Sequence, residues 1–132
     1  MLNARDALWI RSEERGLDTY LEGRQEWTEL GFRIQVLMVE SGEVVRAVHT
    51  STGSFGRTPA GEFHVYVKSI YSWSVPFHVW MPYAAYFHGG IATHQSPDVP
   101  SYPASHGCVR LPEGEAQRVY GFVDVGTPVS VR

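Results

Sequence analysis

The chain has 132 residues, of which 43% are hydrophobic, and it carries 11 Lys and Arg residues against 14 Asp and Glu residues. A chain of this length forms about one domain and buries a core without disulfides, and its single cysteine excludes an internal one. The net charge of -3 offers no broad basic surface for nucleic acid. No run of roughly 20 apolar residues predicts a membrane span, and the charges within residues 1–16 are not typical of a signal peptide.

Residues 1–31 form an N-terminal segment whose structure the sequence pattern leaves open. This segment holds 4 Arg against 7 acidic residues, so it accounts for the whole net charge. Leu17, Leu21 and Arg24 fit one face of a helix, whereas two short strands joined by a turn at 22–24 fit equally well. We therefore expect either a helix or a hairpin, packed on a domain that begins at residue 32.

The next part of the chain is typical of strands. Phe32–Val39 and Val44–Thr52 are rich in β-branched and aromatic residues and flank a turn at 40–43, which predicts an antiparallel pair. Three glycines and a proline make 53–61 a loop. Apolar and polar residues then alternate over 63–68, which predicts one half-buried strand.

The second half of the chain adds strands and one helix. The alternation over 77–81 predicts a strand, and 125–132 predicts another. Only 113–123 is typical of a helix, because Pro112 stands near its start and acidic residues occupy its first turn. The expected fold class is therefore mainly β, with one short helix near the end.

One stretch of the sequence is almost free of charge. Between residues 69 and 109 the only charged residue is Asp98, yet this stretch holds four of the six histidines and the single cysteine. Such a segment is either core or the lining of a cleft. Apolar strands are usually core, so Phe77, Val79 and Trp80 are expected to be buried. The polar groups favour a cleft, in which a histidine reaches Cys108.

Two short motifs within this stretch carry the chemistry: His88-Gly89-Gly90 and Ser105-His106-Gly107-Cys108-Val109-Arg110. A thiolate nucleophile needs an adjacent base, N–H donors for the developing oxyanion and little bulk near the attacked carbonyl. Gly107 supplies the small neighbour. His106 would project to the same side as Cys108 if both lie on a strand. His88 lies 20 positions upstream, across a loop.

Structural and metal-binding roles are alternatives for the same residues. A lone buried cysteine is usually a small hydrophobe, a lone histidine is usually structural, and Arg110 is equally typical of a surface ion pair. Four residues supply enough nitrogen and sulfur for tetrahedral zinc: His88, His94, His106 and Cys108. The six-residue spacing between the first two argues against it, so neither a metal nor another cofactor is predicted.

The motifs resemble those of the L,D-transpeptidase (YkuD-type) catalytic domain of bacterial cell-wall enzymes. In that family a His is followed, after about sixteen residues, by Ser or Thr, His, Gly, Cys, an aliphatic residue and Arg or Asn. His88 is followed here by sixteen residues and then Ser105-His106-Gly107-Cys108-Val109-Arg110. The resemblance extends over Ser51-Thr52-Gly53, 57–63, Met81-Pro82-Tyr83 and 126–129, and so covers residues 32–132.

The resemblance implies a compact β-sandwich-like domain that acts on peptidoglycan stem peptides in the cell envelope. Cys108 would attack the bond between the third stem residue and the D-amino acid at position four, and His88 would be the base. Ser105 and His106 would polarise the site, and the amides of Gly107 and Cys108 would stabilise the oxyanion. Substrate contacts would come from three further residues: Arg110, Gly89 and Tyr83. Covalent inhibition by carbapenem-type compounds is also implied.

Competing functions remain at this point. The acyl group could pass to an amine, which gives a crosslink or an attached protein, or to water, which gives carboxypeptidase or hydrolase activity. A domain that only binds the wall would have no use for a nucleophile beside a base. Papain-like peptidases fit less well, because there the cysteine precedes the histidine in the sequence. The prolines at 97, 100 and 103 predict a stiff loop over the cleft.

Overall fold

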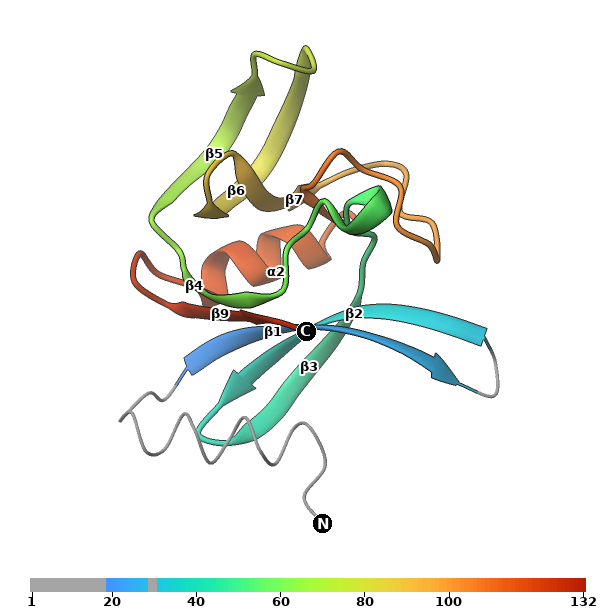
Figure 1. The fold of residues 1–132 in the computed structure, drawn as a ribbon. Helices are drawn as coiled ribbons and strands as arrows, with labels where there is room; N and C mark the ends of the chain where they lie inside the picture. Colours follow the sequence, from blue (N-terminus) through green and yellow to red (C-terminus); the bar gives the residue numbers. More distant parts are fainter. Residues whose placement is uncertain (1–18, 29–30) are drawn as a thin grey trace.

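The computed structural model describes residues 19–28 and 31–132, and within them two β-sheets enclose one α-helix (Figure 1). The first sheet has the strand order β3-β2-β1-β9-β4 and the second has the order β5-β6-β7-β8. Neighbouring strands are antiparallel except for two parallel pairs, β1 with β9 and β7 with β8. The mainly β fold class predicted from the sequence is confirmed.

The first sheet combines four strands from the first half of the chain with the last strand: β1 (Thr19–Thr28), β2 (Gly31–Glu40), β3 (Glu43–His49), β4 (Gly61–His64) and β9 (Pro128–Val131). The β2–β3 hairpin agrees with the predicted antiparallel pair. Its turn consists of Ser41 and Gly42, whose φ angles of 50° and 81° suit a tight two-residue connection.

Strand β1 differs from both structures considered for the N-terminal segment. It runs without a break through 22–24, where a turn was considered, and pairs along its whole length with β2. Neither a helix nor a hairpin turn occupies this part of the chain; the chain reverses after Thr28 instead. β1 also lies inside the first sheet, between β2 and β9, rather than on its surface. The remainder of the predicted segment, residues 1–18, lies outside the described residues.

The alternation over 63–68 belongs to two strands rather than one. β4 ends at His64, and β5 (Val67–Ser74) begins the second sheet. Between them the Val65 amide donates to the Thr127 carbonyl beside the first sheet, and the Tyr66 amide donates to the Tyr86 carbonyl in the second. The chain therefore crosses from one sheet to the other within these two residues. The hydrogen-bond partners change there, but apolar and polar side chains continue to alternate, so the sequence pattern shows no break.

The second sheet contains β5, β6 (Val79–His88), β7 (Ile91–Gln95) and β8 (Val109–Leu111). β5 and β6 form a long hairpin that projects from the rest of the molecule (Figure 1). Phe77, Val79 and Trp80 lie at or near its tip and are exposed. Their predicted burial is wrong, because the hairpin extends beyond the layer that could cover it.

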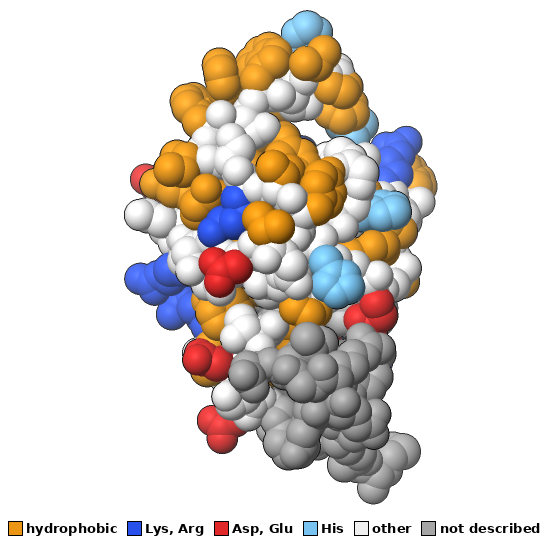
Figure 2. Space-filling model, turned by 90° about the vertical axis from the view of Figure 1, so that its left-hand side faces the viewer, with side chains coloured by type: hydrophobic (Ala, Val, Ile, Leu, Met, Phe, Trp, Pro, Cys, Tyr) orange, Lys and Arg blue, Asp and Glu red, His pale blue; other side chains and the backbone are white. Residues whose placement is uncertain are grey.

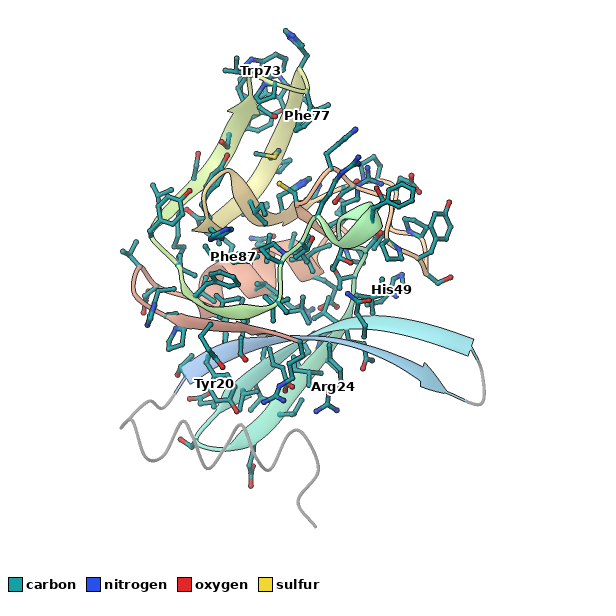
Figure 3. The ribbon with its side chains drawn as sticks, viewed as in Figure 1. Tyr20, Arg24, His49, Trp73, Phe77 and Phe87 are labelled. Atoms are coloured by element: carbon teal, nitrogen blue, oxygen red, sulfur yellow. The ribbon has the colours of Figure 1, made fainter. Side chains whose placement is uncertain are left out.

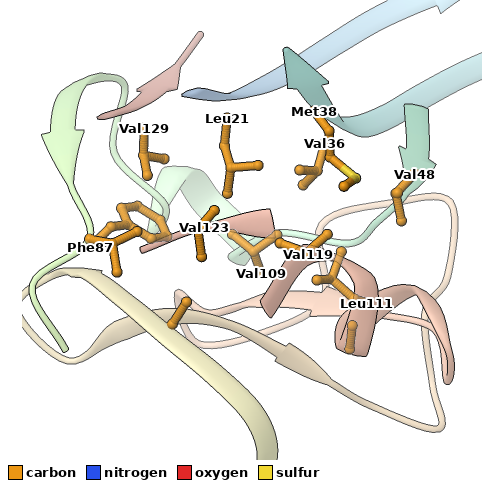
Figure 4. Close-up of a cluster of buried hydrophobic side chains, with 13 residues drawn as sticks. Leu21, Val36, Met38, Val48, Phe87, Val109, Leu111, Val119, Val123 and Val129 are labelled. Carbon is orange, nitrogen blue, oxygen red and sulfur yellow. The ribbon is translucent and has the colours of Figure 1, made fainter. Parts of the chain in front are cut away.

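The predicted helix is confirmed as α2 (Glu115–Phe122), with Glu115 in its first turn. It lies between the two sheets (Figure 1) and contributes to the largest cluster of buried side chains (Figure 4). Thirteen residues form this cluster: Leu21, Val36, Met38, Val48, Val65, Ala85, Phe87, Val109, Leu111, Ala116, Val119, Val123 and Val129. β8 is thus buried in the core immediately after the Ser105–Cys108 motif, which fixes the motif's position.

Candidate active site

Two glycines and a threonine fix the backbone in front of the cysteine. Gly53 and Gly107 lie so close together that a Cβ on Gly53 would meet the Gly107 Cα at 2.8 Å. The Thr58 hydroxyl bridges them: it accepts a hydrogen bond from the Gly53 amide at 2.7 Å and donates one to the Gly107 carbonyl at 2.5 Å. Gly107 has a φ of 144°, which favours glycine. The turn before Cys108 is therefore anchored to the 53–58 loop.

Ser105 supports the same turn from its other side. Its buried hydroxyl accepts a hydrogen bond from the Gly107 amide at 3.1 Å and donates one to the Cys108 carbonyl at 2.5 Å. The Ser105 carbonyl accepts a further bond from the Ser54 amide at 2.9 Å. Because Ser105 holds the backbone on both sides of Gly107, it positions Cys108 and does not contact the thiol through any hydrogen bond found among the described residues.

The Cys108 thiol is partly buried next to the start of β7. It donates to the Gly90 carbonyl oxygen, with Sγ at 3.6 Å. Burial raises the pKa of the thiol, while a hydrogen bond from the Ala92 backbone and the charge of Arg110 lower it in part. The thiol is therefore mainly protonated near pH 7 in this structure, and nucleophilic chemistry requires a base that takes its proton.

Cys108 lies where two pockets meet. One, of about 390 Å³, extends toward the 94–97 segment and Arg110. The other, of about 440 Å³, extends along the hairpin past Trp73. Seven residues line both: Ser74, Phe77, Met81, Gly90, Ile91, His106 and Cys108. Each pocket has the size of a small-molecule site, so two separate groups can approach the thiol.

The rings of Phe77 and His106 stack between these two pockets. Their centroids are 4.4 Å apart and their planes differ by 14°. Phe77 lies near the tip of the β5–β6 hairpin (Figure 3), so the stack connects the hairpin to the cysteine motif. His106 thus lies in the pocket that holds Cys108, with its ring against an aromatic side chain.

His88 lies at the end of β6 and is exposed. Its ring packs against Phe63 with a centroid distance of 4.7 Å, and it lines neither of the two pockets. It precedes Gly90, whose carbonyl contacts the Cys108 thiol, by two residues. The structure therefore brings the backbone that follows His88 to the thiol, while the imidazole ring itself lies against β4.

Gly89 and Tyr83, both predicted to contact substrate, also lie outside the lining of the two pockets. The Gly89 carbonyl accepts a hydrogen bond from the Tyr66 hydroxyl. The Tyr83 ring packs edge-on against Tyr120 of α2, with a centroid distance of 5.6 Å. Both positions support neighbouring elements in this structure.

Arg110 provides the only permanent charge among the described residues that line the first pocket. Its Nη1 atom lies 3.5 Å from a carboxylate oxygen of Asp98 and 3.4 Å from the Asp98 carbonyl. Asp98 is largely exposed, so this ion pair is weak and a ligand carboxylate can replace it. Arg110 is therefore an ion-pair partner of Asp98 that also lines the pocket, and its contact with substrate stays a prediction.

Sequence analysis missed the supporting role of Thr58 and Gly53. Both belong to the run that carried the family resemblance, but their contact with Gly107 links positions about 50 residues apart. The proline-rich loop is likewise held at points that no local pattern indicates. The His49 Nε2 atom lies 2.9 Å from the Val99 carbonyl, and the Ser51 hydroxyl donates to the Tyr102 carbonyl at 2.6 Å.

The described residues contain no group of three or more His, Cys, Asp or Glu side chains placed to hold a metal ion. His94, one of the four ligands considered for zinc, is buried and its Nδ1 atom lies 2.8 Å from the Gln95 carbonyl. Burial lowers the pKa of His94, so this residue is a neutral part of the pocket wall. In the part of the chain covered by the structure, no helix is both long and apolar enough to cross a membrane.

A family model for the L,D-transpeptidase catalytic domain (YkuD) matches residues 33–131. The chain belongs to this family. The L,D-transpeptidase match includes the whole of both pockets, the Ser105–Cys108 motif and His88. No curated protein sequence matches the chain.

Solved L,D-transpeptidase structures share the fold. One from Stackebrandtia nassauensis is 24% identical with a TM-score of 0.71 and aligns over 97% of this chain and 64% of its own. One from Xylanimonas cellulosilytica is 24% identical with a TM-score of 0.72, over 99% and 81%. An L,D-transpeptidase in complex with imipenem is 25% identical with a TM-score of 0.69, over 86% and 59%. This chain therefore spans less than two thirds of the first and third of these structures.

Proposed function

We propose that this domain is a cysteine L,D-transpeptidase that acts on peptidoglycan tetrapeptide stems in the cell envelope. The Cys108 sulfur attacks the carbonyl carbon of the third stem residue, and the bond to the D-amino acid at position four breaks. The thiol proton goes to the departing amine, which leaves a thioester on Cys108. An amine acceptor then takes the acyl group and restores the thiol. The observation that carries this proposal is the position of Cys108 at the meeting point of two pockets, one for each substrate.

The raised pKa of the Cys108 thiol means that a base must accept its proton before or during attack. We assign this role to His88. Its place two residues before Gly90, whose carbonyl already accepts from the thiol, supports the assignment. The ring has to leave its contact with Phe63 to reach the sulfur, and its exposed position leaves room for that rotation. His106 lies in the pocket and polarises the attacked group.

The oxyanion of the tetrahedral intermediate needs N–H donors. The Gly107 amide, expected in that role, already donates to Ser105 Oγ. It can serve the oxyanion only if that bond opens, so we assign the first contact to the Cys108 amide. Arg110 can bind a stem carboxylate through its planar guanidinium once the substrate replaces Asp98.

The decisive experiment is incubation with tetrapeptide stems, with and without an amine acceptor, followed by mass analysis. The unaltered domain should form a crosslinked product and acquire the mass of a carbapenem such as imipenem. Cys108→Ala should do neither while it keeps the wild-type circular dichroism. Acylation that persists in Cys108→Ala would refute the proposal. Hydrolysed stems alone, in the presence of acceptor, would instead identify a carboxypeptidase.

The base is tested with a matched pair of histidine variants. His88→Gln should lower the rate of acylation by about a hundredfold or more. His64→Gln, at an exposed position on β4, should leave that rate unchanged. Equal rates in the two variants would remove His88 from the mechanism, and loss of activity in His106→Gln alone would transfer the role to His106.

A further inference from the structure

The β5–β6 hairpin carries a row of three aromatic rings that contact one another at tilted angles. Tyr71 and Trp80 lie 4.4 Å apart between ring centroids, and Trp80 and Trp73 lie 5.0 Å apart. Cross-strand pairing explains why the rings meet, since Trp73 and Trp80 are directly opposite each other. It does not explain their exposure, which is 58% for Tyr71, 43% for Trp73 and 53% for Trp80. Hydrophobic side chains dominate this end of the molecule (Figure 2).

The surface formed by Tyr71, Trp73 and Trp80, here called the aromatic row, lies on a hairpin that carries no charged side chain after Lys68. Residues 69–97 contain no Lys, Arg, Asp or Glu. Lys68, just before them, is turned away, because its Nζ atom donates to the Val123 carbonyl and lies over the Tyr120 ring. Adjoining large apolar side chains that are this exposed are a candidate binding site. Its partner must be uncharged where it touches the rings, which disfavours an anionic lipid surface or an acidic peptide.

The aromatic row is continuous with the candidate active site. Trp80 lines the first pocket and Trp73 lines the second, and both pockets contain Cys108. A ligand on the row is therefore a part of the substrate that lies beyond the reacting peptide bond. In an extended stem, the three residues before that bond span roughly 10 Å, and the sugar that bears the stem follows. This step rests on the proposed function.

We propose that the aromatic row binds sugar rings of the glycan strand that carries the stem peptide. A pyranose ring presents a flat face of C–H bonds, which is neutral and complements the electron-rich face of an aromatic ring. Its hydroxyl groups point to the edge of the ring, where they remain in contact with water. The hairpin thus binds a stem peptide that is still attached to its glycan strand more tightly than it binds a free stem peptide.

The test measures binding of an uncharged N-acetylglucosamine tetrasaccharide by titration calorimetry. Tyr71 lines neither pocket, so its variants separate sugar binding from catalysis. Tyr71→Ser should weaken binding roughly three- to tenfold. Tyr71→Phe should retain the wild-type affinity because the ring remains. Phe55→Ser removes an exposed aromatic ring outside the hairpin and should change nothing.

Kinetics with two substrates distinguish this inference from the proposed function. Tyr71→Ser should raise KM for a stem that carries its disaccharide and leave turnover of a sugar-free stem unchanged. Turnover of both substrates with no tetrasaccharide binding would overturn the sugar site and leave the transpeptidase intact. Two other outcomes would also overturn the sugar site, provided that the tetrasaccharide does not bind. If the domain binds phosphatidylcholine vesicles and Tyr71→Ser abolishes this binding, the aromatic row binds a membrane. If the domain forms a dimer and Tyr71→Ser abolishes it, the row binds a second copy.

Discussion

Replacement of Gly53 by Ala tests whether close backbone packing holds the cysteine in place. The added Cβ would lie 2.8 Å from the Gly107 Cα and 2.9 Å from both the Arg57 Cβ and the Thr58 nitrogen. None of these atoms is the mobile end of a side chain, so the backbone itself has to move. Gly53 has a φ of -68°, which alanine adopts readily, so the effect is purely steric.

Overpacking of this kind costs about 1–3 kcal/mol. The lower backbone entropy of unfolded alanine offsets about 0.4–1 kcal/mol of it. We therefore expect a net loss of about 1–2 kcal/mol, or roughly 4–8 °C in Tm for a domain of this size. Because Gly107 immediately precedes Cys108, the same shift should change the rate at which the Cys108 thiol reacts with iodoacetamide.

Urea denaturation followed by fluorescence measures the stability, and mass spectrometry measures the alkylation. Gly121→Ala is the matched control, because a Cβ there meets no atom within 4 Å and the residue lies in α2. It should stabilise the domain by about 0.5–1 kcal/mol and leave alkylation unchanged. If Gly53→Ala is as stable as the wild type and its thiol reacts at the same rate, the contact with Gly107 does not position the cysteine.

Three further predictions follow from the same region. Thr58→Val should lower the free energy of unfolding by about 2–4 kcal/mol, because the Gly53 amide and the Gly107 carbonyl both lose a buried hydrogen-bond partner. A loss below about 1 kcal/mol in urea denaturation would contradict the role of the Thr58 hydroxyl as a bridge. The alkylation rate of Cys108 should rise about tenfold per pH unit from pH 6 to 8, because burial raises the thiol pKa. Arg110→Gln should move this pH profile to higher pH, because the charge of Arg110 lowers the thiol pKa. A rate that reaches a plateau below pH 7 would contradict the raised pKa. Burial lowers the pKa of His94, so the unfolded chain binds a proton that the folded chain does not, and stability should fall as pH drops below about 6.5. His94→Gln should reduce this dependence in denaturation curves at pH 7.5 and 5.5, and an unchanged slope would contradict it.

The fold was predictable from the sequence where local pattern and tertiary environment agree. The β2–β3 hairpin and helix α2 were found because each has a clear turn or a polar start and an apolar face. The crossing at Val65 and Tyr66 was not predictable, because alternation continues while the hydrogen-bond partners change sheets. Strand β1 was not predicted as one strand, because Gly23 suggested a turn; in the structure Gly23 lies within the strand, opposite Val36 and Val131.

The site was predictable to the extent that its residues are adjacent in the sequence. Ser105 and Cys108 form one turn, and Arg110 follows on β8 at the pocket wall. The Thr58 bridge depends on a contact across about 50 residues, which no spacing rule indicates. Phe77 was wrongly predicted to be buried in the core, because apolar residues occur both in cores and in the walls of clefts. Only the projection of the hairpin from the molecule shows that Phe77 belongs to the wall of a pocket.

The parallel pairing of β1 with β9 has a consequence for the order of folding. Val129 follows its partner Leu21 by 108 positions, and β4 joins the first sheet through β9. On the ribosome β1, β2 and β3 can pair as they emerge, but the sheet cannot be completed until residues 128–131 have been synthesised. The core that supports β8 and the Cys108 turn then forms last. A nascent chain without residues 128–131 therefore lacks the completed sheet that packs against the core containing β8.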